Sequence, residues 1–181
     1  MNTIKMHKLF FLWDFKKEEK WLEAMSRRGL KLRDVGAFTY FFESGAPKER
    51  IYRLQMLDVW PNSAAGRQYI QFVEDTGVEC VGTIMRWVYF CKDADDGPFE
   101  IFSDAASGLS HVTRMLVIAC IAASGALSAG ISRLIGLIAG DLWIEPITTL
   151  LIWAVDVLLG YGIFRLARMR AQMKREARLR E

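Results

Sequence analysis

Two long apolar stretches dominate the C-terminal half of the chain. Residues 115–139 (MLVIACIAASGALSAGISRLIGLIA) and 142–164 (LWIEPITTLLIWAVDVLLGYGIF) each exceed the roughly 20 residues that an α-helix needs to cross a bilayer core. Only Gly140 and Asp141 separate them. The pattern therefore predicts a hairpin of two transmembrane helices, and a buried helical pair of a soluble protein is the alternative.

Basic residues flank this hairpin on one side only. Arg114 precedes the first span, the joining turn has no Lys or Arg, and residues 165–181 are rich in arginine. Because Lys and Arg accumulate in cytoplasmic segments, we expect a two-pass protein of the cell membrane (inner or plasma) with both termini cytoplasmic. The residues expected at the membrane surface, in contact with lipid, are Arg165, Arg168, Arg170, Lys174 and Arg175.

Small residues recur along the first span, which predicts a smooth helix face for close packing against the second span or another copy. These residues are Ala122, Ala126, Gly130, Gly136 and Gly140. Arg133 and Asp156 are charged residues within the spans, and intramembrane charges are candidate functional residues by default. Counted from the joining turn, the two differ in depth by about 12 Å, so they are not expected to form a direct pair.

Residues 1–98 alternate short β-type runs with amphipathic helical runs. The first half, about 7–43, is expected to hold a strand at KLFFLW, a helix of about 14 residues with Asp14 as its N-cap, and strands over 30–36 and 38–43. The second half, about 50–92, is expected to hold a strand at RIYRLQML, a helix over roughly 64–76, and strands near 78–83 and 86–92.

The two halves are similar when the chain is shifted by 48 positions. Trp21 then aligns with Tyr69, Gly29 with Gly77, and Phe42 with Phe90. Self-similarity at a fixed period indicates a duplicated supersecondary unit. Two βαββ units predict an α+β fold, a ferredoxin-like two-layer sandwich with both helices on one face of an antiparallel or mixed sheet.

The predicted strands carry many aromatic side chains, and strand alternation places rings on both faces of the sheet. Since the helices are expected to cover one face, the other is expected to bind a protein or a small apolar ligand. The alternative is that the linker, the second half's long connection or a second copy covers it. The residues assigned to this face are Phe38, Tyr40, Phe42, Tyr52, Trp87 and Tyr89.

Residues 99–114 connect the predicted sheet to the first span. Phe99, Phe102, Ala106 and Leu109 recur at spacings of three and four. This spacing predicts an amphipathic linker helix that lies at the membrane interface or continues into the span. Movement of the domain would reach the membrane through this helix, and a rigid connector is the alternative.

Composition and charge exclude several classes of protein. Hydrophobic residues make up 52% of the 181 residues and the mean hydropathy is +0.13, which excludes a disordered chain. The net charge is +3, but residues 1–104 sum to −1 and residues 105–181 to +4. Because phosphate attraction supplies most non-specific affinity for nucleic acid, no nucleic-acid partner is expected.

Residues with reactive side chains are sparse. His7 and His111 are too far apart in the sequence to suggest a nucleophile system or a metal site. The acidic pairs Glu18–Glu19 and Asp95–Asp96 are expected to be solvated. We therefore expect no catalytic residue, metal or cofactor, and no enzymatic activity.

The cysteines do not change this expectation. The apolar run at the N-terminus is too short for a signal-peptide core, so the N-terminal domain is expected in the reducing cytosol. Cys80, Cys91 and Cys120 are then reduced packing residues.

One family combines these features. The stretches KLFFLWDFKKEEKWLEAMSRRG, LRDVGAFTYFFESG, IYRLQML, WVYFCKD and FEIFSD resemble the bacterial family of domain of unknown function 2812 over most of residues 7–104. The resemblance implies a small membrane protein, mainly of Gram-positive bacteria and often encoded beside PadR-type repressors, with no established activity. It also leads us to expect Gly-Trp after each helix, where this chain has Gly29-Leu30 and Gly77-Val78.

Two functions fit the sequence. The first is a membrane-anchored, non-enzymatic regulatory or interaction module whose aromatic sheet face binds a protein or a small apolar ligand. The second is an accessory subunit of a larger membrane transporter or channel. A protein partner or a homo-oligomer is expected in either case.

Overall fold

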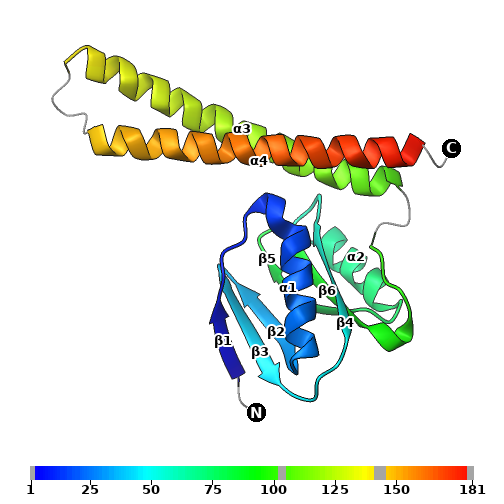
Figure 1. The fold of residues 1–181 in the computed structure, drawn as a ribbon. Helices are drawn as coiled ribbons and strands as arrows, with labels where there is room; N and C mark the ends of the chain where they lie inside the picture. The colour runs from blue at the N-terminus through cyan, green and yellow to red at the C-terminus, as the bar shows by residue number, and fades with distance from the viewer. Residues whose placement is uncertain (1–2, 102–104, 141–145, 179–181) are drawn as a thin grey trace. The chain divides into compact units, whose positions relative to one another are not determined.

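The computed structural model describes residues 3–101, 105–140 and 146–178. It divides into two compact units, residues 1–103 and 104–181. The first unit is α+β and the second is a pair of long helices (Figure 1). In chain order the elements of the first unit are β1 (Thr3–His7), η1 (Leu12–Asp14), α1 (Phe15–Arg27), β2 (Leu30–Gly36), β3 (Thr39–Ser44), β4 (Arg50–Met56), α2 (Ala64–Glu74), β5 (Glu79–Ile84), β6 (Trp87–Asp93) and η2 (Ala94–Asp96).

The strands form two three-stranded antiparallel sheets instead of the single sheet that the sequence predicts. Their orders are β1-β3-β2 and β4-β6-β5. Strands β2 and β5 lie next to each other at the boundary, where Lys31 Nζ is 2.7 Å from Glu79 Oε2. Side chains, and not a backbone ladder, therefore connect the two sheets at this boundary.

The two helices do not share one face of a sheet, which corrects the two-layer expectation. Side chains alternate along β6, so Tyr89 points to one face while Val88 and Phe90 point to the other. Tyr89 reaches α1, whereas Val88 and Phe90 pack in a cluster with Val73 of α2. Helix α1 also packs against β4 and β2, so it covers the face of the second sheet that was expected to be open.

The segment KLFFLW is not a strand, because its rings pack against helix α1. The first strand is Thr3–His7, five positions earlier, and residues 12–14 form the short helix η1. The Phe10 ring lies 5.6 Å from the Trp21 ring, and Trp13 is buried. Asp14 precedes α1 as predicted, but its side chain pairs with Lys17 and makes no capping hydrogen bond.

The second unit consists of α3 (Ala105–Ile138) and α4 (Pro146–Arg178). Both are long and apolar enough to cross a membrane, with candidate spans Ser107–Ile138 and Ile147–Glu176. The expected linker helix over 99–114 is not a separate element: from Ala105 onward it is continuous with α3, as in the alternative in which it continues into the span. Phe99 lies outside any helix, buried with Leu57 and Phe90, because its ring completes the core around α2. Phe102 lies outside the described residues, as does the side chain of Ala106.

Gly29 and Gly77 offer a matched test of the turns that end α1 and α2. Both adopt a left-handed backbone, with φ of 82° and 84°. A Cβ on Gly29 would lie 2.5 Å from the Gly45 carbonyl oxygen, whereas a Cβ on Gly77 would meet nothing within 4 Å. We expect Gly77→Ala to lower the free energy of unfolding by about 1 kcal/mol through backbone strain alone. Gly29→Ala should cost at least twice that in urea titrations of the full chain in detergent, and equal losses would contradict the close contact.

Candidate functional site

The aromatic residues assigned to an open sheet face lie mostly in the interior. Tyr40, Phe42, Tyr52 and Tyr89 are at most 6% exposed, and Trp87 is partly buried. Only Phe38 is well exposed, at 60%. The face is therefore covered, but by α1, and not by the linker, the second half's long connection or a second copy, which were the covers considered from the sequence.

A buried carboxyl holds this interior together. Glu18 of α1 is 6% exposed, and its Oε1 accepts hydrogen bonds from the hydroxyls of Tyr40 (2.6 Å) and Tyr89 (2.7 Å). Tyr40 belongs to β3 and Tyr89 to β6, so one side chain links both sheets to α1. Burial raises the pKa of the Glu18 carboxyl, against the opposing effect of the two phenol donors.

Glu19 is buried beside it and serves the second sheet. Its Oε1 accepts a hydrogen bond from the Leu54 amide of β4 at 3.0 Å, and Lys16 lies 3.2 Å from its Oε2. Burial raises the pKa of Glu19, and the charges of Lys16 and Arg53 oppose that rise. The expectation that Glu18 and Glu19 are solvated is wrong, because the face of α1 that carries them is the one enclosed by both sheets. Asp95 and Asp96 are exposed, as predicted.

The sequence does contain a signal for Glu18. Phe15, Glu18, Leu22 and Met25 recur at spacings of three and four, so Glu18 lies on the apolar face of its helix. A carboxyl on such a face needs partners, and hydroxyl groups on neighbouring strands supply them. Through these two hydrogen bonds the Glu18 carboxyl joins α1 to both sheets.

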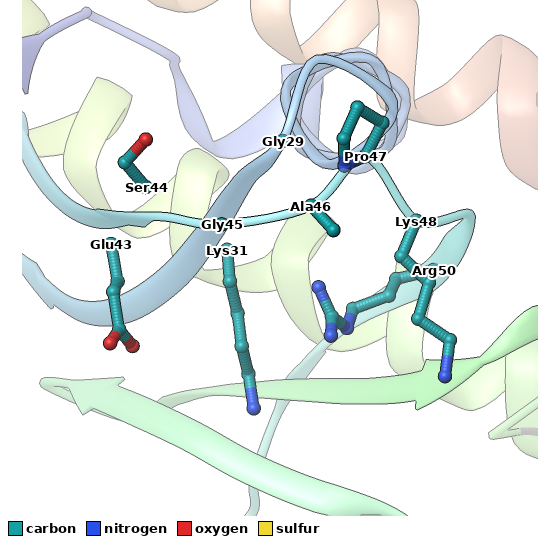
Figure 2. Close-up of a pocket in the computed structure, with 9 residues that line it drawn as sticks. All are labelled: Gly29, Lys31, Glu43, Ser44, Gly45, Ala46, Pro47, Lys48 and Arg50. Atoms are coloured by element: carbon teal, nitrogen blue, oxygen red, sulfur yellow. The ribbon is translucent and has the colours of Figure 1, made fainter.

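A solvent-accessible pocket lies at a different place, around the connection from β3 to β4 (Figure 2). Its volume is about 290 Å³. Lys31, Lys48 and Arg50 supply three cations to its wall and Glu43 one carboxylate. The remaining lining residues are Gly29, Ser44, Gly45, Ala46 and Pro47.

Hydrogen bonds fix the pocket's wall to the end of α1. The Ser26 hydroxyl donates to the Lys48 carbonyl at 2.7 Å, and the Gly45 amide donates to the Gly29 carbonyl at 2.8 Å. Gly29 is required at this point because any side chain would collide with Gly45. The wall is therefore held in place before any ligand arrives.

The cations of the pocket are paired with carboxylates at its edge. Asp93 lies 2.7 Å from Lys48 Nζ and 2.9 Å from Arg50 Nε. The hydrogen bond from Lys48 lowers the pKa of Asp93, with the charge of Arg50 as a further cause, and partial burial opposes it. The pocket thus offers charged hydrogen-bonding groups of both signs, which suits a polar segment of a protein or a small polar molecule.

The second unit brings two predicted residues together. A Cβ on Gly130 of α3 would lie 3.2 Å from Asp156 Oδ2 of α4 and 3.5 Å from Ile152 Cγ2. Among the described residues, Asp156 Oδ2 is buried without a hydrogen-bond partner. Arg133 does not pair with Asp156 but donates to the Thr148 hydroxyl at 2.7 Å.

The small residues of α3 contribute unequally to the helix pair. Gly130 is buried, Ala126 and Gly136 are partly buried, and Ala122 and Gly140 are exposed. The contact face instead includes Ala123, because seven-residue spacing stays on one side of a helix while repeated steps of four drift around it. The basic residues of the tail continue α4: Arg165 is partly buried, and Arg168, Arg170, Lys174 and Arg175 are exposed.

Two of the cysteines lie in surroundings that disfavour their thiolates. Burial raises the pKa of the Cys80 and Cys91 thiols to about 11, and all three cysteines are free thiols. His7 Nδ1 lies 3.1 Å from the Thr39 hydroxyl. No set of three His, Cys, Asp or Glu side chains able to hold a metal occurs among the described residues.

Comparison with known families gives a match over the larger part of the chain. Residues 14–124 match a family described as a protein of unknown function, DUF2812. The chain belongs to the DUF2812 family. The matched region contains α1, both sheets except β1, and the first part of α3, so it covers Glu18 and the pocket but not Asp156. No curated protein and no solved structure matches the chain significantly.

Proposed function

We propose that this DUF2812 protein is a membrane-anchored, non-enzymatic regulatory or interaction module. The observation that carries the proposal is the exposure of α3 and α4. In their most apolar windows only 17% and 11% of the residues are buried, and large side chains such as Ile138 and Leu150 are exposed. The core helix of a soluble protein would bury most of such a window, whereas a bilayer supplies apolar surroundings for it.

The distribution of basic residues supports a two-pass topology with both termini in the cytoplasm. Arg165 to Arg175 lie in the part of α4 that follows the apolar stretch, and Arg114 lies near the start of α3. Positive charge at the start of α3 and at the end of α4 favours retention of these two helix ends in the cytoplasm. The N-terminal unit is then cytosolic.

Duplication of one βαββ unit is part of the same proposal. Both sheets have the order first-third-second strand, and each shows a register shift at matching positions, between Leu32 and Asp34 and between Cys80 and Gly82. These positions are 48 residues apart, as are Gly29 and Gly77. The agreement supports descent of both halves from one unit.

The pocket between β3 and β4 is the contact site that we propose for a protein segment or a small polar ligand. It replaces the aromatic sheet face, most of whose rings are buried. Its wall is fixed by backbone hydrogen bonds, so binding would cost little ordering of the domain. Charged groups of both signs give it the means to select a partner.

Filling this pocket should abolish partner binding and leave the anchor intact. Ala46 is exposed and lines the pocket, so Ala46→Trp places an indole in the space without altering a charge. Ala65→Trp makes the same change at an exposed position of α2 and is the control. In native membranes, the wild type and both full-length variants should resist extraction at alkaline pH. Each protein is then purified from those membranes in mild detergent. A stoichiometric partner, identified by mass spectrometry, should be lost in Ala46→Trp only.

Two results would contradict the proposal. Release of the wild-type chain by alkaline extraction would refute the membrane anchor. A partner retained by Ala46→Trp as well as by Ala65→Trp would refute the pocket as the contact site.

An accessory subunit of a transporter or channel is the second candidate, and Asp156 is the observation that favours it. A carboxyl oxygen buried in an apolar helix pair without a hydrogen-bond partner is costly, and a polar group from another membrane helix would satisfy it. A polytopic membrane protein that co-purifies with the wild type and is lost with Asp156→Leu would favour this function.

A further inference from the structure

Exposed apolar side chains gather at one end of the N-terminal unit, which we call the apolar end. Trp60 is 56% exposed and Met85 is 75% exposed. Single apolar residues on a surface are ordinary, but a group contributed by several segments marks an interaction surface. The members of the apolar end are Leu9, Phe11, Val59, Trp60 and Met85.

Two of the three segments meet through β4 and β6. Met56, the last residue of β4, pairs with Trp87, the first residue of β6. The Leu57 amide then donates to the Arg86 carbonyl at 2.8 Å, and Arg86 Nε donates back to the Leu57 carbonyl. The connection that carries Val59 and Trp60 therefore begins beside the β5–β6 turn that carries Met85.

Ring contacts bring the third segment to the same end. The Trp87 ring lies 6.1 Å from the ring of Phe15, the first residue of α1. The Phe11 ring stacks on Trp13, 5.1 Å between centroids, immediately before α1. In Figure 1 the start of α1 and the end of β4 lie at the same end of the unit.

Met85 is unusual in its backbone as well as its exposure. Its φ is 53°, in the left-handed region where glycine, asparagine and aspartate are the common residues. In a turn exposed only to water, one of those residues would adopt this backbone conformation with less strain than methionine. An exposed methionine held there suggests that its side chain has an apolar contact outside the unit.

Exposed cations outnumber exposed acids around the apolar end. Lys16 and Lys17 lie in the first turn of α1, Arg67 in the first turn of α2, and Arg86 in the β5–β6 turn, against Asp14 and Asp58. Asp14 pairs with Lys17, and the buried Glu19 pairs with Lys16. An apolar and aromatic centre with a basic rim is the composition that binds the headgroup region of an anionic bilayer.

The chain between the N-terminal unit and α3 is short. Ile101 packs against the cluster that contains Leu57, and α3 begins at Ala105. Four residue steps span at most about 14 Å. The pocket lies at the start of β4 and the apolar end at its finish, about 20 Å apart along a seven-residue strand.

We propose that the apolar end docks on the anionic cytosolic face of the membrane, with the Trp60 and Met85 side chains in the headgroup region. Docking in this way leaves the pocket directed toward the cytosol. The inference rests on the membrane anchor of the proposed function and is independent of what the pocket binds.

A fluorophore at each end of β4 tests the docking. The full chain with Cys120→Ala carries either Met85→Cys or, as the control, Glu49→Cys, an exposed position at the pocket end. Cys91 is buried and the raised pKa of Cys80 keeps it a thiol near neutral pH, so labelling is directed to the new cysteine. The labelled proteins are placed in nanodiscs of phosphatidylcholine and phosphatidylglycerol that contain a headgroup-region nitroxide lipid.

We expect the fluorophore at position 85 to be blue-shifted and quenched by the nitroxide, and the fluorophore at position 49 to be neither. Addition of Trp60→Asp, or replacement of phosphatidylglycerol by phosphatidylcholine, should reduce the quenching at position 85. Equal quenching at both positions, or none at either, would overturn the docking. Energy transfer between differently labelled copies without nitroxide quenching would also overturn it, in favour of a second copy. Failure of the chain to enter nanodiscs would instead refute the anchor.

Discussion

Replacement of Glu18 by alanine is expected to lower the free energy of unfolding of the N-terminal unit by about 3 kcal/mol. Two buried phenol hydroxyls, those of Tyr40 and Tyr89, would lose their acceptor, at a cost of about 1–3 kcal/mol each. Relief of the buried carboxyl offsets part of that cost. Glu18→Gln is the matched control, because its amide oxygen still accepts both bonds and cannot ionise.

The two variants also differ from the wild type in their dependence on pH. Burial raises the pKa of Glu18 above 4.5, so the folded unit retains this proton to a higher pH than the unfolded chain. The stability that Glu18 contributes is fully present below pH 4.5 and declines as pH rises through its folded-state pKa. Glu19, whose pKa is also raised by burial, acts in the same direction. Asp93, whose pKa is lowered mainly by the Lys48 hydrogen bond, contributes stability that is lost as pH falls.

Urea titrations of the full chain in detergent at a series of pH values measure this effect. As pH rises above 4.5, the free energy of unfolding of Glu18→Gln should increase relative to that of the wild type. The reason is that the variant lacks the loss of stability that ionisation of Glu18 causes in the wild type. Parallel curves for the two proteins would show that Glu18 titrates normally. A loss in Glu18→Gln as large as in Glu18→Ala would show that the two tyrosines do not depend on its oxygen.

Gly130→Leu is the second change with a large expected effect, a loss of about 2–3 kcal/mol in the stability of the helix pair. Its side chain would have to occupy the space of Asp156 Oδ2, Ile152 Cγ2 and Trp153 Cε2, the last two 3.5 Å from where a Cβ would lie. Gly125→Leu is the control, because a Cβ there meets nothing within 4 Å.

Thermal unfolding of the full-length variants in mild detergent, followed by the circular dichroism of the helices, distinguishes the two. Gly125→Leu should unfold at the same midpoint temperature as the wild type, and Gly130→Leu should unfold at a lower one. If both leucine variants behave like the wild type, α3 and α4 do not pack through Gly130. If a co-purifying membrane protein is lost in Gly125→Leu but not in Gly130→Leu, that partner binds the outer face of α3.

The elements with strong local signals follow from the sequence. Strand 50–56 alternates clearly, and α2 begins at a true cap, where Ser63 Oγ accepts the Gly66 amide at 3.1 Å. The apolar stretches are likewise plain from their length. These features depend on residues that are neighbours in the chain, so periodicity suffices to find them.

The misplaced features depend on contacts between distant residues. Whether Tyr52 and Tyr89 face solvent was decided by α1, which belongs to the first half of the domain but covers a sheet of the second. The pocket is formed by segments from residues 29–50, none of which has an unusual composition by itself. No local pattern could reveal either arrangement. The position of Glu18 on an apolar helix face did, however, indicate that α1 is enclosed by other elements.

The position of α1 also has a consequence for biosynthesis. The helix is made early, yet its main packing partner β4 and its hydrogen-bond partner Tyr89 are made much later. The N-terminal half therefore cannot complete its core while it emerges alone from the ribosome. The last strand ends at Asp93 and the first candidate span begins at Ser107, so closure around α1 and entry of the chain into the membrane become possible at nearly the same stage of synthesis.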